Sequence, residues 1–136
     1  METHDLKSAG LKITLPRIKI LNILEKQSKN RHLSAEQVYK ILLSENEDIG
    51  LATVYRVLTQ FEAAGLVSRH HFDGGNSIFE LSDTGHHDHI MCMKCGKVDE
   101  FKDESIEIRQ KEIAGNLGYE LTDHNLYLYG FCPNCR

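Results

Sequence analysis

The stretch from Glu80 to Cys95 concentrates more metal-ligand chemistry than any other part of the chain. Its candidate ligands are His86, His87, Asp88, His89, Cys92 and Cys95. The apolar residues that follow the histidines favour a β-strand, in which successive side chains point to opposite faces. His86 and Asp88 would then share one face, and His87 and His89 the other. One short strand could therefore supply two different metal centres, provided that other segments complete them.

The four cysteines of the chain form two C-x-x-C pairs, Cys92 with Cys95 and Cys132 with Cys135. In an intracellular protein such pairs bind metal more often than they form disulfides. Four thiolates make a closed tetrahedral zinc site, which is structural rather than catalytic. A redox couple would account for one pair alone, so we favour zinc.

Acidic residues recur around the histidines, at Glu80, Glu100 and Glu107. Mixed imidazole and carboxylate ligands suit a divalent first-row metal, and carboxylates favour Fe²⁺ or Mn²⁺ over a closed zinc site. The alternative is an inert surface cluster, because adjacent histidines are common on protein surfaces. Spacing alone does not say which acid joins which histidine.

Composition places few constraints on the partner. The chain has 136 residues and a net charge of −4, which by itself argues against nucleic acid. The charge is uneven, however, because residues 7–31 carry seven Lys or Arg and a single acid, Glu25, for a local charge of +6. No apolar run reaches the length of a membrane span and the N-terminus is polar. We expect a cytoplasmic protein with no membrane partner.

The first half of the sequence predicts helices followed by a β-hairpin. A short N-terminal helix precedes one that begins after Thr14, one that begins after Ser34 with a capping box to Gln37, and one from about 51 to 64. The hairpin has strands on either side of the turn D-G-G-N. Helices followed by such a wing make a winged helix-turn-helix, whose last helix reads DNA.

The helix over 51–64 carries an apolar stripe and, opposite it, Ala52, Tyr55, Arg56 and Thr59. Arg can bind guanine or phosphate, and Tyr can contact a thymine methyl group. Taken alone, this face is more typical of an ordinary solvated surface, where an exposed Tyr-Arg pair is common, and the wing is what favours DNA binding. His70 and His71 are expected to be exposed wing residues near phosphates.

The second half changes character near residues 82–85, which we interpret as a hinge. We expect strands around 86–92 and 97–101, a helix over 105–116, and two further strands over 118–123 and 125–131. Both faces of the last strand are apolar, which suggests burial against a second subunit. The predicted fold is α+β, with a winged-helix domain over 1–83 and a small α/β dimerisation domain over 84–136.

Four stretches together resemble the ferric uptake regulator family: G-L-K-I-T-L-P-R, L-A-T-V-Y-R-V-L-T-Q-F-E-A-A-G-L-V, H-H-D-H-I-M-C-M-K-C-G-K-V and the terminal C-P-N-C. The likeness covers essentially the whole chain. It implies a dimeric, metal-activated repressor that binds A/T-rich operators of iron-uptake genes. It also implies DNA contacts from the reading helix and from a basic residue near an A/T minor groove; the residues concerned are Lys12, Thr53, Tyr55 and Arg56.

The resemblance also sorts the ligands. It implies structural Zn²⁺ at Cys92, Cys95, Cys132 and Cys135. It implies a regulatory site for Fe²⁺, with Mn²⁺ or Zn²⁺ as substitutes, at His32, Glu80, His87, His89 and Glu100. It implies an additional metal site at His86, Asp88, Glu107 and His124. Glu80 and Glu100, where the peroxide-sensing branch tends to use Asp, favour the iron-responsive branch.

Other functions fit the sequence less well. A zinc hydrolase would need an open zinc with a nearby base, and the chain has no H-E-x-x-H motif. A thiol oxidoreductase would explain only the cysteines, and a metal-buffering protein would leave the basic helical half unused. We therefore expect no enzyme activity. A regulator on the same scaffold that senses zinc or manganese, and a tetramer rather than a dimer, remain open alternatives.

Overall fold

The computed structural model describes residues 3–26, 32–72, 77–82 and 87–136, the side chains from residue 6 onward. The chain divides into two compact units, Met1–Gly85 and His86–Arg136. In the described part of the chain, no helix combines the length and apolar character that crossing a membrane requires.

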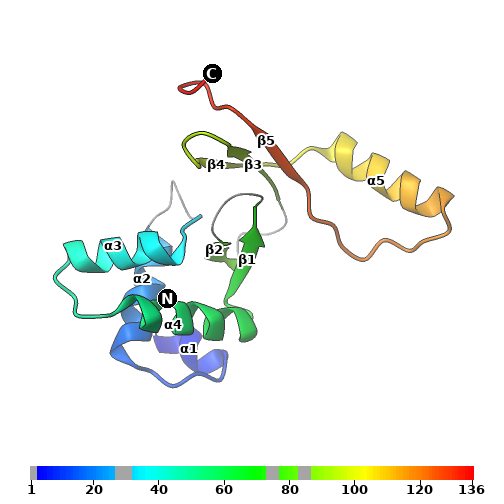
Figure 1. The fold of residues 1–136 in the computed structure, drawn as a ribbon. Coiled ribbons are helices and arrows are strands. Elements are labelled where there is room, and N and C mark those ends of the chain that lie inside the picture. Colours follow the sequence, from blue (N-terminus) through cyan, green and yellow to red (C-terminus); the bar gives the residue numbers. More distant parts are fainter. Residues whose placement is uncertain (1–2, 27–31, 73–76, 83–86) are drawn as a thin grey trace. The chain divides into compact units, whose positions relative to one another are not determined.

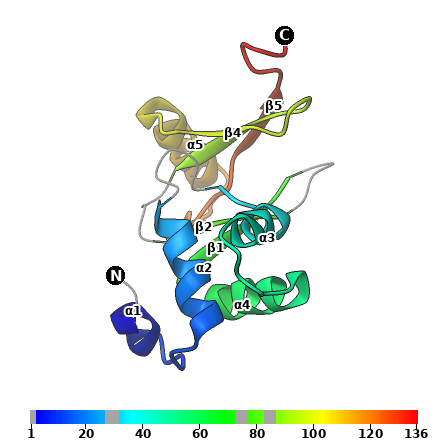
Figure 2. The ribbon, with the colours of Figure 1, turned by 90° about the vertical axis from the view of Figure 1, so that its left-hand side faces the viewer.

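The first unit is built from four helices and a two-stranded sheet. Its elements are α1 (Thr3–Ser8), α2 (Leu15–Lys26), α3 (Ala35–Ser44), α4 (Leu51–Ala63), β1 (Val67–His71) and β2 (Ser77–Leu81). Figures 1 and 2 show α2, α3 and α4 gathered around the β1–β2 hairpin. The predicted winged helix-turn-helix arrangement is therefore present.

Local signals begin and end these helices as predicted. The Thr14 hydroxyl accepts a hydrogen bond from the amide of Arg17 at the start of α2. Ser34 and Gln37 form the complete capping box of α3. The chain turns out of α4 at Gly65, whose φ of +81° is accessible to glycine at little cost.

One core joins all the elements of the first unit. It includes fully buried side chains from the helices and from the wing, such as Leu6, Leu24, Leu42, Leu58 and Phe79. An isolated antiparallel β-bridge extends this sheet, because Leu33 and Phe79 exchange backbone hydrogen bonds of 3.1 and 2.8 Å. This bridge fixes the segment before α3 against β2.

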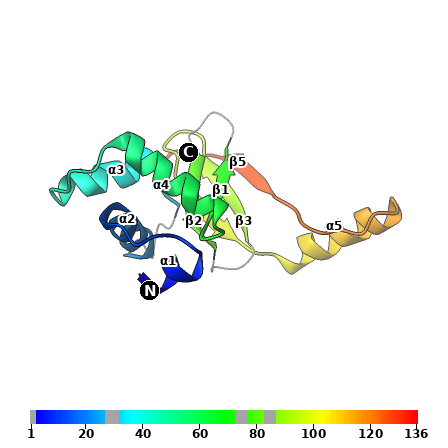
Figure 3. The ribbon, with the colours of Figure 1, turned by 90° about the horizontal axis from the view of Figure 1, so that it is seen from below.

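The second unit contains a three-stranded sheet and one helix. The elements are β3 (Asp88–Cys92), β4 (Val98–Phe101), α5 (Glu104–Asn116) and β5 (Tyr127–Gly130). The strand order is β4-β3-β5, with β3 antiparallel to β4 and parallel to β5. In Figure 3, α5 extends away from this sheet, and a long connection returns from it to β5. The two units together confirm the predicted α+β fold.

One predicted strand is wrong. Residues 119–126 have no regular secondary structure, and the last strand is confined to Tyr127–Gly130. A strand needs a neighbouring ladder for its backbone N–H and C=O groups. Within the described residues of this chain, the sheet of the second unit offers 118–123 no such neighbour.

Candidate metal centres and nucleic-acid interface

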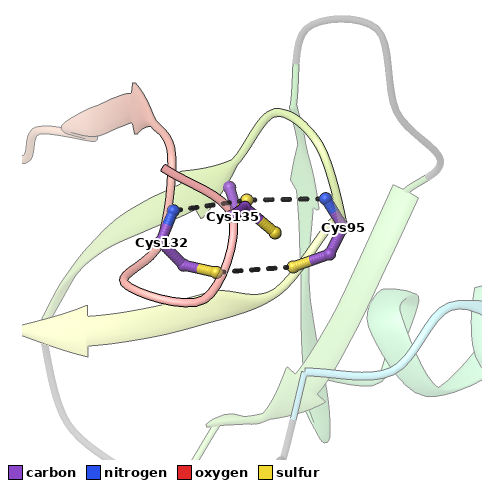
Figure 4. Close-up of side chains that lie close together, drawn as sticks. Cys95, Cys132 and Cys135 are labelled. Atoms are coloured by element: carbon purple, nitrogen blue, oxygen red, sulfur yellow. Dashed lines mark hydrogen bonds between the residues drawn. The ribbon is translucent and has the colours of Figure 1, made fainter.

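The four cysteines meet at one end of the second sheet. Cys92 ends β3 and pairs with Gly130 of β5, so the two C-x-x-C turns that follow these strands lie side by side. The four sulfur atoms all lie within 4.8 Å of one another. Figure 4 shows Cys95, Cys132 and Cys135 converging, with 3.8 Å between the Sγ atoms of Cys95 and Cys132. Zn–S bonds of about 2.3 Å in a tetrahedron separate the sulfurs by about 3.8 Å, so the donor set fits zinc.

Backbone amides prepare this site for a cation. The Sγ of Cys92 accepts hydrogen bonds from the N–H groups of Cys95 and Cys132, both at 3.4 Å. Chiefly these two bonds lower the pKa of Cys92 to about 5, so it is a thiolate at neutral pH. The pKa of Cys135 is raised to about 12, first by its hydrogen bond with Cys132 and then by burial. Zinc binds deprotonated thiols, so its binding would release the remaining protons of the four cysteines.

His32 and Glu80 come together in the first unit. The Leu33–Phe79 bridge places the residues beside it next to each other, and Nε2 of His32 lies 2.9 Å from Oε2 of Glu80. Both side chains are buried. A buried imidazole and a buried carboxylate this close together could both be ligands of one divalent cation.

His70 joins this pair, which the sequence analysis did not predict. Its Nε2 lies 2.7 Å from Oε1 of Glu80, in hydrogen-bonding geometry. The expectation that His70 points to solvent on the wing is therefore wrong. His71, by contrast, is exposed, and its Nδ1 lies 3.0 Å from the Ser77 hydroxyl. Alternation along β1 sends the two histidines to opposite faces.

His87, His89 and Glu100 cluster in the second unit. The two imidazole rings are 4.8 Å apart, edge to face, and Nε2 of His87 lies 3.5 Å from Oε1 of Glu100. His89 is directly opposite Glu100 in the β3–β4 ladder, so their side chains leave the same face. The five predicted regulatory ligands thus form two groups, one in each unit.

Of the additional predicted ligands, Asp88 lies on β3, on the face opposite that of His89. Asp88 is buried, and its Oδ1 lies 3.4 Å from Nε2 of His124. Glu107 and His124 line one hollow of about 320 Å³ beside α5. His86, the fourth residue of this set, lies outside the described residues.

The predicted DNA-contacting residues lie on one scaffold in the first unit. Tyr55 and Arg56 are exposed on α4, Thr53 is half-buried there, and Lys12 is exposed before α2. Arg17 connects these regions, because one guanidinium nitrogen donates to the Lys12 carbonyl at 2.9 Å and the other to Oε1 of Gln60 on α4 at 2.8 Å. The segment that carries Lys12 is therefore held against α4.

Tyr55 has a partner that sequence reasoning missed. Its hydroxyl lies 2.9 Å from each carboxylate oxygen of Glu36, in the first turn of α3, and donates to that group. This hydrogen bond is the main reason why the pKa of Tyr55 is raised. A carboxylate therefore orients the aromatic ring on the face proposed to meet DNA.

Signals for the missed residues were partly available. The sequence predicted the hairpin but not its register, which pairs His70 with Ile78 and Ser68 with Glu80. His70 and Glu80 are then diagonal neighbours on one face. No comparable signal links Glu36 to Tyr55 or Arg17 to Gln60, because these contacts depend on how the helices pack.

Comparisons of the sequence and of the structure with known proteins all point to one family. The ferric uptake regulator family model matches residues 8–129. The ferric uptake regulation protein of Legionella pneumophila is 67% identical over 135 residues, covering 99% of this chain and 98% of that protein. The crystal structure of the Vibrio cholerae ferric uptake regulator superposes with a TM-score of 0.89 at 59% identity, covering 96% of this chain and 98% of that one.

Two further similar structures contain a metal. The ferric uptake regulator of Pseudomonas aeruginosa with manganese has a TM-score of 0.79 at 59% identity, covering 98% of each chain. The regulator of Francisella tularensis with iron has a TM-score of 0.87 at 42% identity, covering 93% of this chain and 95% of that one.

Proposed function

The chain belongs to the ferric uptake regulator family of metal-responsive transcriptional regulators, which are not enzymes, and from this premise we propose a repressor whose regulatory metal is Fe²⁺. It would bind A/T-rich operators of iron-uptake genes when loaded with that metal. Members of the family bind DNA and are generally dimeric. We propose the same for this chain, acting in the cytoplasm, with the winged-helix domain over 1–83, a hinge at 82–85 and the dimerisation domain over 84–136.

The observation that carries the proposal is the division of the ligand set. His32 and Glu80 form one group in the first unit, and His87, His89 and Glu100 form another in the second. Bound metal would supply a common centre of positive charge for both groups. Residues that share one ion favour a single arrangement of the two units over the alternatives, and such differential affinity is what a population shift requires.

The donor types support the choice of metal. Imidazole nitrogens with carboxylate oxygens suit Fe²⁺ and Mn²⁺, whereas the four thiolates suit Zn²⁺. Similar solved structures contain iron and manganese. We propose structural zinc at the cysteines and Fe²⁺ at the divided site, with Mn²⁺ or Zn²⁺ as substitutes. The set at Asp88, Glu107, His124 and His86 would bind additional metal.

Operator recognition is proposed for the exposed face of α4. Arg56 and Tyr55 would reach the major groove, with Thr53 beside them. Lys12, held near α4 through Arg17, would reach phosphate or a narrow minor groove. In a dimer, two such faces would meet successive half-sites of a palindromic operator.

The test is an operator titration at fixed salt over a range of Fe²⁺ or Mn²⁺ concentration. We expect His32→Ala to keep the fold, the zinc and the dimer but to lose metal-activated binding. His124→Ala is the matched control, because its site lies wholly in the second unit, and it should cause a smaller defect. If His32→Ala responds like the parent protein while His124→Ala does not respond, the switch has been assigned to the wrong site.

A metal-buffering role is the second candidate, since it would also use the histidines and carboxylates. Buffering does not need Lys12 or the exposed face of α4. Lys12→Ala should weaken operator binding and reduce its salt dependence by about one phosphate contact. If metal changes neither affinity nor specificity for A/T-rich palindromic DNA, buffering becomes the better explanation.

A further inference from the structure

The carboxylate of Glu80 contacts two histidines through different oxygens. Oε2 lies 2.9 Å from Nε2 of His32, and Oε1 lies 2.7 Å from Nε2 of His70. All three side chains belong to the first unit. The two contacts therefore leave each carboxylate oxygen of Glu80 beside its own imidazole.

The two histidines differ in the oxygen that each contacts. His70 is in hydrogen-bonding geometry with Oε1, at a distance typical of an N–H group that donates to a carboxylate. His32, which the proposed function treats as a metal ligand, lies beside Oε2. His70 is therefore placed as a hydrogen-bond donor to the carboxylate oxygen other than the one beside His32.

The backbone determines this placement of His70. In the β1–β2 ladder His70 is opposite Ile78 and Ser68 is opposite Glu80, which makes His70 the diagonal neighbour of Glu80 on the same face. The next residue, His71, points to the other face and meets Ser77. The side chain of His70 is only 11% exposed, so its imidazole has a restricted set of orientations.

We propose that His70 is a positioning residue for the regulatory metal site, and this rests on the function proposed above. Its Nε2–H would hold Oε1 of Glu80, so that Glu80 offers the metal Oε2 alone, on the side facing His32. Residues that hydrogen-bond to a ligand in this way orient it, and their loss typically weakens metal binding ten- to a hundredfold. His70 would thereby restrict Glu80 to one-oxygen coordination.

The experiment uses the full-length, zinc-loaded protein in a His124→Ala background, which removes the additional site. Co²⁺ is titrated into the parent, His70→Ala, His70→Gln, His71→Ala and His32→Ala. Affinity and the visible absorption spectrum of bound Co²⁺ are recorded, because the spectrum reports coordination number and geometry. Zinc content and thermal unfolding confirm that each variant is folded.

We expect His70→Ala to bind Co²⁺ at least tenfold more weakly and with an altered spectrum, because both Glu80 oxygens become available to the metal. His70→Gln retains an N–H donor, so it should keep the parent spectrum and most of the affinity. His71→Ala should match the parent, since the residue lies on the opposite face of the same strand.

Two outcomes would overturn the inference while leaving the proposed function intact. In the first, His32→Ala loses binding but His70→Ala binds like the parent. In the second, His70→Gln is as weak as His70→Ala, which is the behaviour of a direct ligand. If His32→Ala itself binds like the parent, the regulatory site is wrongly assigned and the inference falls with it.

Discussion

The two units of this chain bury apolar surface very differently. In the first, every helix and both strands contribute to one core, and side chains such as Leu24, Leu58 and Phe61 are fully buried. Among the described residues of the second, Cys92 has the only buried apolar side chain, and α5 buries none. The second unit instead exposes much of its apolar surface, including Ile108, Leu117, Tyr119, Leu128 and Phe131.

The difference indicates how each unit is stabilised. Hydrophobic burial is the main favourable term in folding, and small domains that lack it need metals, disulfides or partner subunits. The first unit has a core of its own. The second brings four sulfurs together and leaves an apolar strand and helix uncovered, which is the pattern expected of a fold completed by zinc and by a second copy.

If the cysteines hold structural zinc as proposed, its removal should have the largest effect, and that effect should be confined to the second unit. Cys132→Ser takes away one thiolate, and since structural zinc binding is coupled to folding, β3, β4 and β5 should lose amide protection by at least about a hundredfold. Protection in α2, α3 and α4 should be unchanged. Hydrogen exchange with mass spectrometry measures both units in one experiment.

Met93→Ser is the matched control, because Met93 lies in the same turn as the cysteines and is exposed. It should keep full zinc content and parent exchange. If Cys132→Ser keeps its zinc, or if the second unit stays protected without zinc, then the four cysteines do not stabilise this unit through zinc.

A core substitution should show the reverse pattern. Leu58→Ala removes a fully buried side chain from α4 and should lower the free energy of unfolding of the first unit by about 2–5 kcal/mol. Leu43→Ala changes an exposed leucine of the same unit and should cost no more than about 0.5 kcal/mol. Denaturant-dependent hydrogen exchange separates the two units, and equal losses of protection in both would mean that they unfold as one.

The exposed strand of the second unit provides the next test. Leu128→Glu, on β5, should raise the dimer dissociation constant about ten- to a hundredfold if this face is the subunit interface, because a charge would be buried there. Leu43→Glu is the matched control, since Leu43 is 52% exposed and Leu128 is 42% exposed. Sedimentation over a range of protein concentrations measures both, and an unchanged dimer in Leu128→Glu would place the interface elsewhere.

The smallest effect concerns the polar face of α4. The hydrogen bond to Glu36 raises the pKa of Tyr55, so its phenol should stay neutral to a higher pH than the ordinary value of about 10. A raised pKa stabilises the folded state fully below that ordinary value, and the contribution is lost as pH rises through the folded-state pKa.

Glu36→Gln should shift the titration of Tyr55 to lower pH by removing the carboxylate. Ultraviolet absorbance of the phenolate follows the titration, and Tyr55→Phe identifies the Tyr55 component among the five tyrosines. An unchanged midpoint in Glu36→Gln would show that the Glu36–Tyr55 contact does not persist in solution.

The amino-acid sequence determined the features that arise from neighbouring residues. The capping box of Ser34 and Gln37, the start of α2 at Thr14 and the end of α4 at Gly65 were predictable because caps and turns use residues a few positions apart. Alternation likewise assigned His87 and His89 to one face of a strand, where the structure places them together. Motif content was sufficient to indicate the family.

Tertiary structure alone decided the contacts between distant segments. The strand expected over 118–123 has favourable residues but no neighbouring strand in this chain, and local propensity carries no information about a missing partner. The Glu36–Tyr55 and Arg17–Gln60 hydrogen bonds depend on how helices pack, and the His70–Glu80 bond depends on hairpin register. Residues far apart in sequence become neighbours only when burial and backbone pairing fix the fold, so these partners were decided by the assembled structure.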